Sequence, residues 1–348
     1  MEKVISPDFR GATLGYANRP AFANLYAVAG RFISIESADR DHAELFRHHF
    51  ANLHVTSVVG KTISKPDATI FVAPTSDPPP APSHLEAFEV AEGGICRTDA
   101  TNYFLECNGS AIRANGVSPP FVEVWVGQGT QARERGALSR LIFNASMTAM
   151  RRCGLFELQA AGVVRDGLGV LVIGPSGSGK STLATQLATA GWQYLSDDAL
   201  LLYNNHEKIE AHAVRRVFSL KEETISAGGM AHIESVAPDP RHFDPLKKAF
   251  APQAVFPDQF VKVCAPTTLF FSQITNEPSS STRALSRNET MGRLLRMCPW
   301  SCYDKPTART HLSVLAKLAR QARGYELLAG TDLFGDAEFA GRYLAPRT

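Results

Sequence analysis

The stretch that decides the fold is Gly174-Pro175-Ser176-Gly177-Ser178-Gly179-Lys180-Ser181. It fits the pattern G-x-x-x-x-G-K-[ST] without a mismatch. Residues 170–173 form an apolar run before it, as in a buried strand, and residues 182–190 follow it with apolar side chains at helical spacing. A strand, a glycine-rich loop and a helix in this order predict a phosphate-binding P-loop in an α/β fold.

The residue types of this stretch suit a nucleoside triphosphate. Glycines let the backbone curl so that successive N–H groups converge on a phosphate, and the helix N-terminus adds its partial positive charge. We expect Lys180 to reach the β- and γ-phosphates and the Ser181 hydroxyl to ligate Mg²⁺. The predicted cofactors are therefore ATP and Mg²⁺, and the predicted binding residues are Gly174, Pro175, Ser176, Gly177, Ser178, Gly179, Lys180, Ser181 and Thr182.

Two adjacent acids, Asp197 and Asp198, end a short strand-like run after the helix. Ligands of open α/β sheets bind beyond the carboxyl ends of the strands. If this strand is a parallel neighbour of the strand before the loop, both acids face the triphosphate. One acid then helps to hold the metal and the other accepts a proton from an attacking hydroxyl. Alternatively, one acid is a plain metal ligand and the other caps the next segment, as in an ATPase.

Composition narrows the classes of protein. The chain has 348 residues, and 36 Lys and Arg against 34 Asp and Glu leave a net charge of +2, which gives no reason to expect nucleic acid or an anionic membrane as partner. No apolar run approaches the roughly 18 residues of a membrane span. Residues 1–8 lack the apolar region of a secretory signal, and the six cysteines form no zinc pattern. We expect a cytoplasmic protein with reduced thiols.

The sequence predicts two domains with a boundary near residue 130: a smaller N-terminal α+β domain over 1–130, and a P-loop catalytic domain over 131–348. A proline-rich run over 77–82 must be a loop. A long helix over 132–153 is assigned to the second domain. The remaining elements are expected as strands at 31–36, 69–72, 84–90, 95–98, 102–107 and 121–126, and as helices at 38–50 and, near the end of the chain, at 310–323.

Residues 155–203 resemble the catalytic core of HPr kinase/phosphorylase. More closely, they resemble the HPr-kinase-related proteins of ribosomal peptide pathways, which include lasso-peptide kinases. The run over 324–333 is similar to the tail of that family. The resemblance implies a kinase that transfers the γ-phosphoryl group of ATP to a hydroxyl, first of all a serine of a precursor peptide or protein, although a small hydroxyl-bearing substrate stays open. HPr kinases are hexameric, so a homo-oligomer is also implied, although the sequence shows no interface signature.

The resemblance also implies residue roles. Lys180 contacts phosphate, Ser181 ligates Mg²⁺, Asp198 is the general base, and Asp197 supports the metal or the water network. Asp198 follows Gly174 by 24 residues, as in the family. Where the family has a catalytic histidine, 15 residues before the first glycine, this chain has Gln159, which cannot carry a proton near neutral pH.

The family's signature region after the acid pair is not found in residues 219–240. With Gln159, this argues against phosphorylase activity and against HPr as the substrate. A second function from another class therefore stays open, a nucleotide-binding regulatory or scaffold protein with little transferase activity. The sequence leaves the roles of two further residue pairs open. Glu222 and Glu223 supply a second metal ligand or form a solvated turn. Arg215 and Arg216 form a phosphate clamp or a surface pair.

Overall fold

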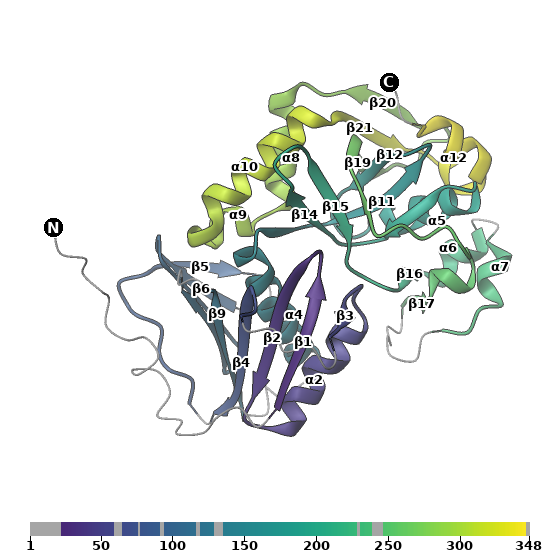
Figure 1. Ribbon diagram of the computed structural model, residues 1–348. Coiled ribbons are helices and arrows are strands. Elements are labelled where there is room, and N and C mark those ends of the chain that lie inside the picture. The colour runs from purple at the N-terminus through teal and green to yellow at the C-terminus, as the bar shows by residue number, and fades with distance from the viewer. Residues whose placement is uncertain are drawn as a thin grey trace.

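The computed structural model describes residues 22–58, 65–75, 77–90, 94–115, 119–128, 135–227, 230–238 and 246–345, which form a mixed α/β structure with several sheets (Figure 1). The predicted α/β class is therefore confirmed. Residues 1–8, for which we expected no secretory signal, lie outside the described residues. The same holds for residues 132–134 at the start of the expected long helix.

A mixed nine-stranded sheet dominates the N-terminal part, with the strand order β3-β1-β2-β4-β9-β8-β7-β6-β5. Its strands β2, β4 and β9 pair in parallel, and the other neighbours are antiparallel. The strands are β1 (Phe22–Val28), β2 (Arg31–Ser37), β3 (Thr56–Ser57), β4 (Ala68–Thr75), β5 (Glu86–Val90), β6 (Gly94–Thr98), β7 (Asn102–Cys107), β8 (Ser110–Asn115) and β9 (Phe121–Gly127). All six predicted strands of this part are present. The sequence missed β1, β3 and β8.

Helices α2 (Arg40–Ala51) and α4 (Arg135–Arg152) cover one face of this sheet (Figure 1). The assignment of the long helix to the second domain stays a prediction, although much of its packing is on the N-terminal sheet. Leu141, Ile142 and Ala145 of α4 lie in one hydrophobic core with β4 and β9 of the nine-stranded sheet. The physical reason is that the apolar face of the sheet needs a cover, and α4 supplies the apolar stripe that fits it. The boundary near residue 130 stays a prediction.

The C-terminal part is built on a six-stranded sheet with the order β13-β11-β12-β19-β21-β20. Its strands are β11 (Ala160–Arg165), β12 (Leu168–Ile173), β13 (Gln193–Ser196), β19 (Pro266–Ile274), β20 (Ser281–Ala284) and β21 (Arg323–Ala329). A four-stranded antiparallel sheet lies beside it, with the order β10-β14-β15-β18. Its strands are β10 (Leu155–Leu158), β14 (Leu200–Asn204), β15 (Ile209–Ala213) and β18 (Val263–Cys264).

A two-stranded sheet and the helices complete this part of the chain. They are the pair β16 (Phe218–Leu220) and β17 (Lys248–Phe250), a 3-10 helix over Pro252–Ala254, and the helices α5 (Lys180–Thr189), α6 (Glu222–Ala227), α7 (Ala231–Glu234), α8 (Arg287–Met297), α9 (Trp300–Tyr303), α10 (Lys305–Gln321), α11 (Asp332–Gly335) and α12 (Ala337–Tyr343). Among the described helices, none combines the length and apolarity needed to cross a membrane.

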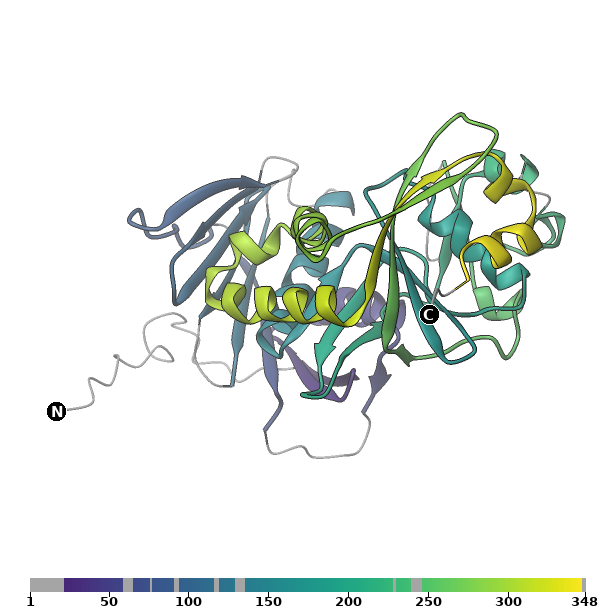
Figure 2. The same cartoon turned by 90° about the horizontal axis from the view of Figure 1, so that it is seen from above.

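Helix α10 differs from the helix predicted over 310–323. It begins at Lys305 and ends at Gln321, and the following residues form β21, which pairs in parallel with β19 inside the sheet. Leu312 is 37% exposed, while Leu315 and Leu318 are buried. The strand was missed because its partner β19 lies about 55 residues earlier in the chain. In Figure 2, α10 runs from the nine-stranded sheet to the six-stranded sheet.

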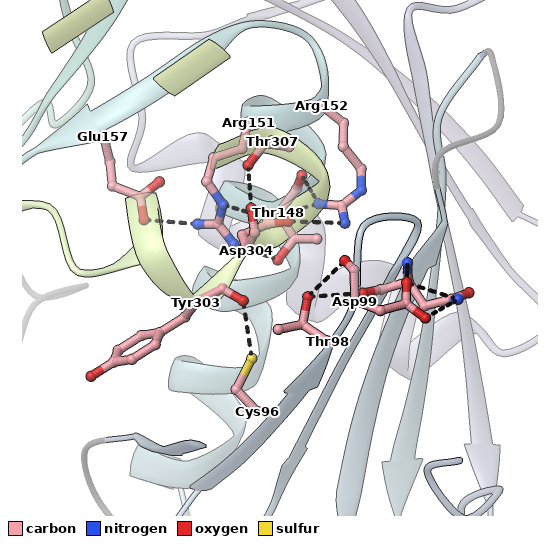
Figure 3. A network of polar contacts seen from close by, with 11 residues as sticks. Cys96, Thr98, Asp99, Thr148, Arg151, Arg152, Glu157, Tyr303, Asp304 and Thr307 are labelled. Carbon is pink, nitrogen blue, oxygen red and sulfur yellow. Dashed lines mark hydrogen bonds and ion pairs between the residues drawn. The ribbon is translucent and has the colours of Figure 1, made fainter. Parts of the chain in front are cut away.

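A buried ionic network joins the two parts of the chain (Figure 3). The Asp304 carboxylate, between α9 and α10, accepts hydrogen bonds from Arg151 Nε at 2.8 Å and from Arg152 Nη1 at 2.9 Å. Arg151 also donates to Glu157 of β10 at 2.8 Å, and its guanidinium lies over the ring of Trp300. Although burial raises the pKa of Asp304, the two guanidinium groups more than offset it and leave that pKa below its usual value. Each charge therefore has a partner, as burial requires.

His311 of α10 lies next to this network and makes stability depend on pH. Its ring is fully buried and stacks on Phe156 with the ring centroids 4.5 Å apart, and neither ring nitrogen has a hydrogen-bond partner among the described residues. Burial and the Arg151 charge lower the pKa of His311 to about 4, against the opposing effect of Asp304. The unfolded chain binds a proton at His311 more tightly than the folded protein does. The contribution of His311 to the free energy of unfolding is therefore present above the ordinary pKa of about 6.5 and is lost as the pH falls toward 4.

We expect His311→Phe to remove this contribution. The parent should lose about 2 kcal/mol of unfolding free energy through His311 between pH 7 and pH 5, and the variant should not lose that amount. Urea unfolding at both pH values measures the difference, with His84→Phe, at an exposed histidine, as control. Equal pH dependence in His311→Phe and the parent would show that His311 does not titrate as argued.

Candidate functional site

The glycine-rich loop lies between the end of β12 at Ile173 and the start of α5 at Lys180. Gly177 and Gly179 have φ of +83° and +88°, in the left-handed region that favours glycine. Gly179 is also the residue directly before the helix, so the backbone turns there and enters α5. The glycines at these two positions are therefore required by the backbone conformation of the loop.

Gly174 is required for a different reason, the close approach of neighbouring atoms. A Cβ at this position would lie 2.4 Å from Ser178 Oγ and 2.9 Å from the main-chain oxygen of Ser272 in β19. The Ser272 hydroxyl in turn donates to the main-chain oxygen of Ser178 at 2.8 Å. The loop is thus held closed against the carboxyl end of β19.

We expect Gly174→Ala to lower the free energy of unfolding by about 1–3 kcal/mol, because the new methyl group overpacks the loop. The same change should weaken the binding of any phosphate ligand, since the loop must open to admit the methyl group. Gly292→Ala is the matched control, because no atom lies within 4 Å of a Cβ built there. Thermal unfolding and ligand titration check both effects, and a Gly174→Ala protein that matches Gly292→Ala in both would contradict the argument.

The acid pair lies at the same edge of the sheet as the loop, but not in the way the sequence predicted. Strands β12 and β13 are each antiparallel to β11, which lies between them. They are therefore parallel to each other without being neighbours. Asp197 and Asp198 follow the end of β13 as Gly174 follows the end of β12, so the carboxyl ends of both strands meet at one edge.

The Lys180 ammonium group lies in the centre of this edge. Its side chain is 5% exposed, and Nζ donates to the main-chain oxygen of Pro175 at 2.9 Å. Nζ is also 3.9 Å from Asp198 Oδ1. Burial lowers the pKa of Lys180, against the opposing effect of Asp198 and Asp197. The structure thus holds a largely buried cation under the loop, close to one carboxylate.

Asp198 lies between two cations. Its carboxylate is 38% exposed and is 3.9 Å from Lys180 Nζ and 3.4 Å from Arg215 Nη1. Arg216, the other member of the arginine pair, instead donates to the main-chain oxygen of Val55 at 2.9 Å, in the N-terminal part. Of the two arginines, only Arg215 pairs with a site carboxylate.

Asp197 is buried, with 2% of its surface exposed, and its Oδ2 accepts a hydrogen bond from the Ser219 N–H at 2.9 Å. Burial raises the pKa of Asp197 to about 6, against the lowering effect of the Ser219 N–H. The Ser181 hydroxyl donates to the main-chain oxygen of Asp197 at 3.4 Å. The two residues predicted to hold the metal therefore lie side by side.

These residues fit a magnesium–nucleotide complex by the chemistry of the donor set. Mg²⁺ usually takes one or two carboxylates and completes its shell with phosphate oxygens and water. Asp197 and the Ser181 hydroxyl offer oxygen ligands beside the glycine-rich loop, and within the described part of the chain the buried Ser178 hydroxyl oxygen of that loop lacks a hydrogen-bond partner. Within the described ranges, no three His, Cys, Asp or Glu side chains form a metal cluster. Glu222 and Glu223 are exposed at the start of α6 and show no contact with Asp197.

Gln159 lies at the same edge, between β10 and β11. The register pairs Ala160 with Ile173 and Leu158 with Leu200, so Gln159 sits between the start of the loop and the chain that follows Asp198. Its side chain is exposed. Among the other predicted binding residues, Pro175, Ser176 and Gly177 are exposed, and Thr182 is half-buried in the first turn of α5.

A cavity of about 340 Å³ opens on the other side of the loop, and the sequence did not predict it. It is lined by loop residues 174–178, by the carboxyl end of β19, and by Arg293, Arg296 and Met297 of α8. Arg293 pairs with Glu326 of β21. The sequence by itself assigns no role to Arg293 or Arg296. No local signal connects them with the loop, because they lie more than 100 residues away along the chain.

No family model and no curated protein matches this chain. Solved structures do match, among them the HPr(Ser) kinase/phosphatase from Coxiella burnetii, with 15% sequence identity, a TM-score of 0.26, and coverage of 37% of this chain and 70% of that chain. A likeness at this identity and TM-score assigns neither a fold nor a function to the chain.

Proposed function

We propose that this chain is an ATP-dependent kinase that transfers the γ-phosphoryl group to a hydroxyl, with the glycine-rich loop as a P-loop of the HPr-kinase-like type. The observation that carries the proposal is the meeting of Lys180 and Asp198, 3.9 Å apart, where the loop and the acid pair leave the same edge of the sheet. A phosphate-binding cation beside a half-exposed carboxylate is the pair of groups that phosphoryl transfer to a hydroxyl requires.

In this proposal the chain's own groups hold the triphosphate. The loop N–H groups and the N-terminus of α5 bind phosphate oxygens, and Lys180 gives up its hydrogen bond to Pro175 for the β- and γ-phosphates. Ser181 and Asp197 would hold Mg²⁺, which when bound neutralises charge on the β- and γ-phosphates. Asp197 suits this place because the Ser219 N–H donates to its carboxylate and fixes the orientation of that carboxylate.

Asp198, the more exposed of the two acids, takes part in the transfer itself. The acceptor oxygen attacks the γ-phosphorus, the bond from that phosphorus to the bridging oxygen breaks, and ADP leaves. The hydroxyl proton passes to Asp198, whose carboxylate is accessible and is oriented by Lys180 and Arg215. Arg215 is then free to contact the γ-phosphate oxygens with its planar fork.

The acceptor is proposed from the sequence resemblance. A serine of a precursor peptide in a peptide-modification pathway, such as a lasso-peptide pathway, is the first candidate, and a small hydroxyl-bearing molecule is the second. The homo-oligomer is likewise proposed from the sequence resemblance.

Transfer of ³²P from γ-labelled ATP tests the function directly. The chain is incubated with Mg²⁺, labelled ATP and serine-containing peptides, including any small peptide encoded beside its gene. Label should appear in a peptide as phosphoserine. Label found only in free phosphate, or none released at all, favours the second candidate, a nucleotide-binding regulatory protein. That candidate draws support from Gln159, which stands where the kinase family has a proton-carrying histidine.

Gln159 leads to a prediction about reversibility. Its amide does not ionise near neutral pH, so it orients a water or hydroxyl but cannot shuttle a proton. We expect little phosphorolysis of the phosphorylated product by inorganic phosphate, and no imidazole limb in the pH profile of the forward rate. Purified phosphoproduct, Mg²⁺ and excess phosphate should yield little pyrophosphate. Rapid pyrophosphate release would contradict this, and Gln159→His is the complementary variant.

A further inference from the structure

The cavity beside the loop has the character of a small-molecule site. Its volume of about 340 Å³ lies at the lower end of the roughly 300–1,000 Å³ found for such sites. Phe271, Ile274 and Met297 supply apolar surface to its lining, and polar groups are added by Gln273 and Glu326. It opens at the carboxyl ends of β12 and β19, the place where open α/β sheets bind their ligands.

The reacting end of the site lies on the opposite side of the loop. Lys180 and Arg215 each pair with Asp198 there, and none of the three lines the cavity. The order of the strands explains the separation, because the acid pair follows β13 on one side of β12 and the cavity borders β19 on the other. The first half of the loop borders both places, because residues 174–178 line the cavity and Pro175 among them accepts the hydrogen bond of Lys180.

We propose, resting on the proposed function, that this cavity receives the nucleoside half of the bound nucleoside triphosphate. A triphosphate chain that lies along the loop with its γ-phosphate at Asp198 points its other end away from β13 and toward β19. The nucleoside then enters the cavity between Ile274 and Met297, where apolar side chains pack against the faces of the base.

The two arginines of α8 take different roles in this arrangement. The guanidinium of Arg293 is already held by Glu326 and lies 5.9 Å from the ring centroid of Phe271, so it shapes the wall of the cavity. Arg296 is exposed and has no ion pair within the described part of the chain. Its free cation suits the α-phosphate or the face of the base.

An acceptor in this cavity does not fit the chemistry. The acceptor hydroxyl must attack the γ-phosphorus in line and pass its proton to Asp198. The cavity lies behind the loop, on the side of its first residues, where Asp198 takes no part in the lining. The cavity therefore suits the non-reacting end of the nucleotide.

The test distinguishes binding of the nucleoside from binding of the phosphates by comparing ATP with inorganic tripolyphosphate as probes. Met297→Trp fills the cavity without changing charge, and Asn288→Trp places the same side chain at an exposed position of the same helix outside the cavity. Titration calorimetry gives the Kd of each probe for both variants and the parent. Thermal unfolding confirms that each variant is folded.

Met297→Trp should raise the Kd of ATP by about tenfold or more and change the Kd of tripolyphosphate by less than about twofold, the scale of losing one well-packed contact. Asn288→Trp should change neither value. An unchanged Kd of ATP in Met297→Trp, or an equal loss of both probes, overturns the inference. So does a result in which only the KM of an acceptor peptide rises. The proposed function fails separately, if ATP binds in this cavity-dependent way but no phosphoryl group is transferred.

Discussion

Lys180→Ala is expected to lower the affinity for ATP by about 10²-fold, or about 3 kcal/mol, and to reduce turnover with it. The side chain is almost fully buried under the loop, with Nζ on the Pro175 oxygen at 2.9 Å. A triphosphate offers this cation far stronger partners than a main-chain carbonyl does. The alanine variant keeps the loop N–H groups but loses this point charge from under the loop.

Titration of ATP into Lys180→Ala and into the parent measures this loss. Lys208→Ala is the matched control, because Lys208 is exposed in the turn between β14 and β15, remote from the loop along the chain. The apo protein should remain as stable as the parent, since burial already disfavours the ammonium form and lowers the pKa of Lys180. Equal affinity for ATP in Lys180→Ala and the parent would contradict the proposed binding of the ATP phosphates by Lys180 and the loop.

Asp198→Asn is expected to lower kcat by about 10²–10⁴-fold while ATP binding is kept. The amide has the size of the carboxylate and accepts hydrogen bonds, but it cannot take the proton of the acceptor hydroxyl. Because the transition state of phosphoryl transfer is loose, the loss should lie toward the lower end of this range. The affinity for ATP should stay the same or increase, since Lys180 and Arg215 both lose a carboxylate that competes with the phosphates.

Single-turnover transfer of labelled phosphate and a separate ATP titration distinguish the two effects. Asp166→Asn serves as control, because Asp166 is an exposed acid in the turn between β11 and β12, at the end of β12 opposite the loop. Full transfer activity in Asp198→Asn would mean that this carboxylate only positions Lys180 and Arg215. Loss of ATP binding together with activity would also contradict the role of a base.

The two variants together separate binding from chemistry. Lys180→Ala should act mainly on the affinity for ATP, and Asp198→Asn mainly on the rate of transfer. A protein that only binds nucleotide would lose affinity for ATP in Lys180→Ala. It would show no phosphoryl transfer in the parent, so Asp198→Asn would have no rate to lower. The pair therefore discriminates the kinase from the regulatory alternative once an acceptor that takes the label has been found.

Local sequence was enough for the parts of the site that lie close together in the chain. The glycines, Lys180 and Ser181 occur within eight residues, and their conformation depends on neighbours in sequence: positive φ at Gly177 and Gly179, and a helix start at Lys180. The two acids are adjacent, and a strand that ends just before them already places them at an edge. The residue types alone left open which acid does what, since the two residues have the same chemistry, and only the family resemblance gave Asp198 the role of base.

Burial distinguished the acids, and burial comes only from the tertiary structure. Asp197 is enclosed and bonded to the Ser219 N–H, which lies on a separate strand, and Asp198 stays half-exposed between Lys180 and Arg215. The same holds for the arginine pair, since Arg215 turns to the site and Arg216 to Val55 in the N-terminal part. Alternation along the chain points two successive side chains apart, but the partners of each depend on distant segments.

By itself, the sequence determined the α/β class and the conformation of the glycine-rich loop, because both depend on hydrogen bonds and steric limits within a few residues. Only the tertiary structure decided the separation of β12 from β13 by β11, the packing of α4 on the nine-stranded sheet, and the cavity between the loop and α8. These features depend on pairings between segments far apart in the chain, and hydrophobic burial selects such pairings by the shape of whole surfaces, which no local pattern encodes.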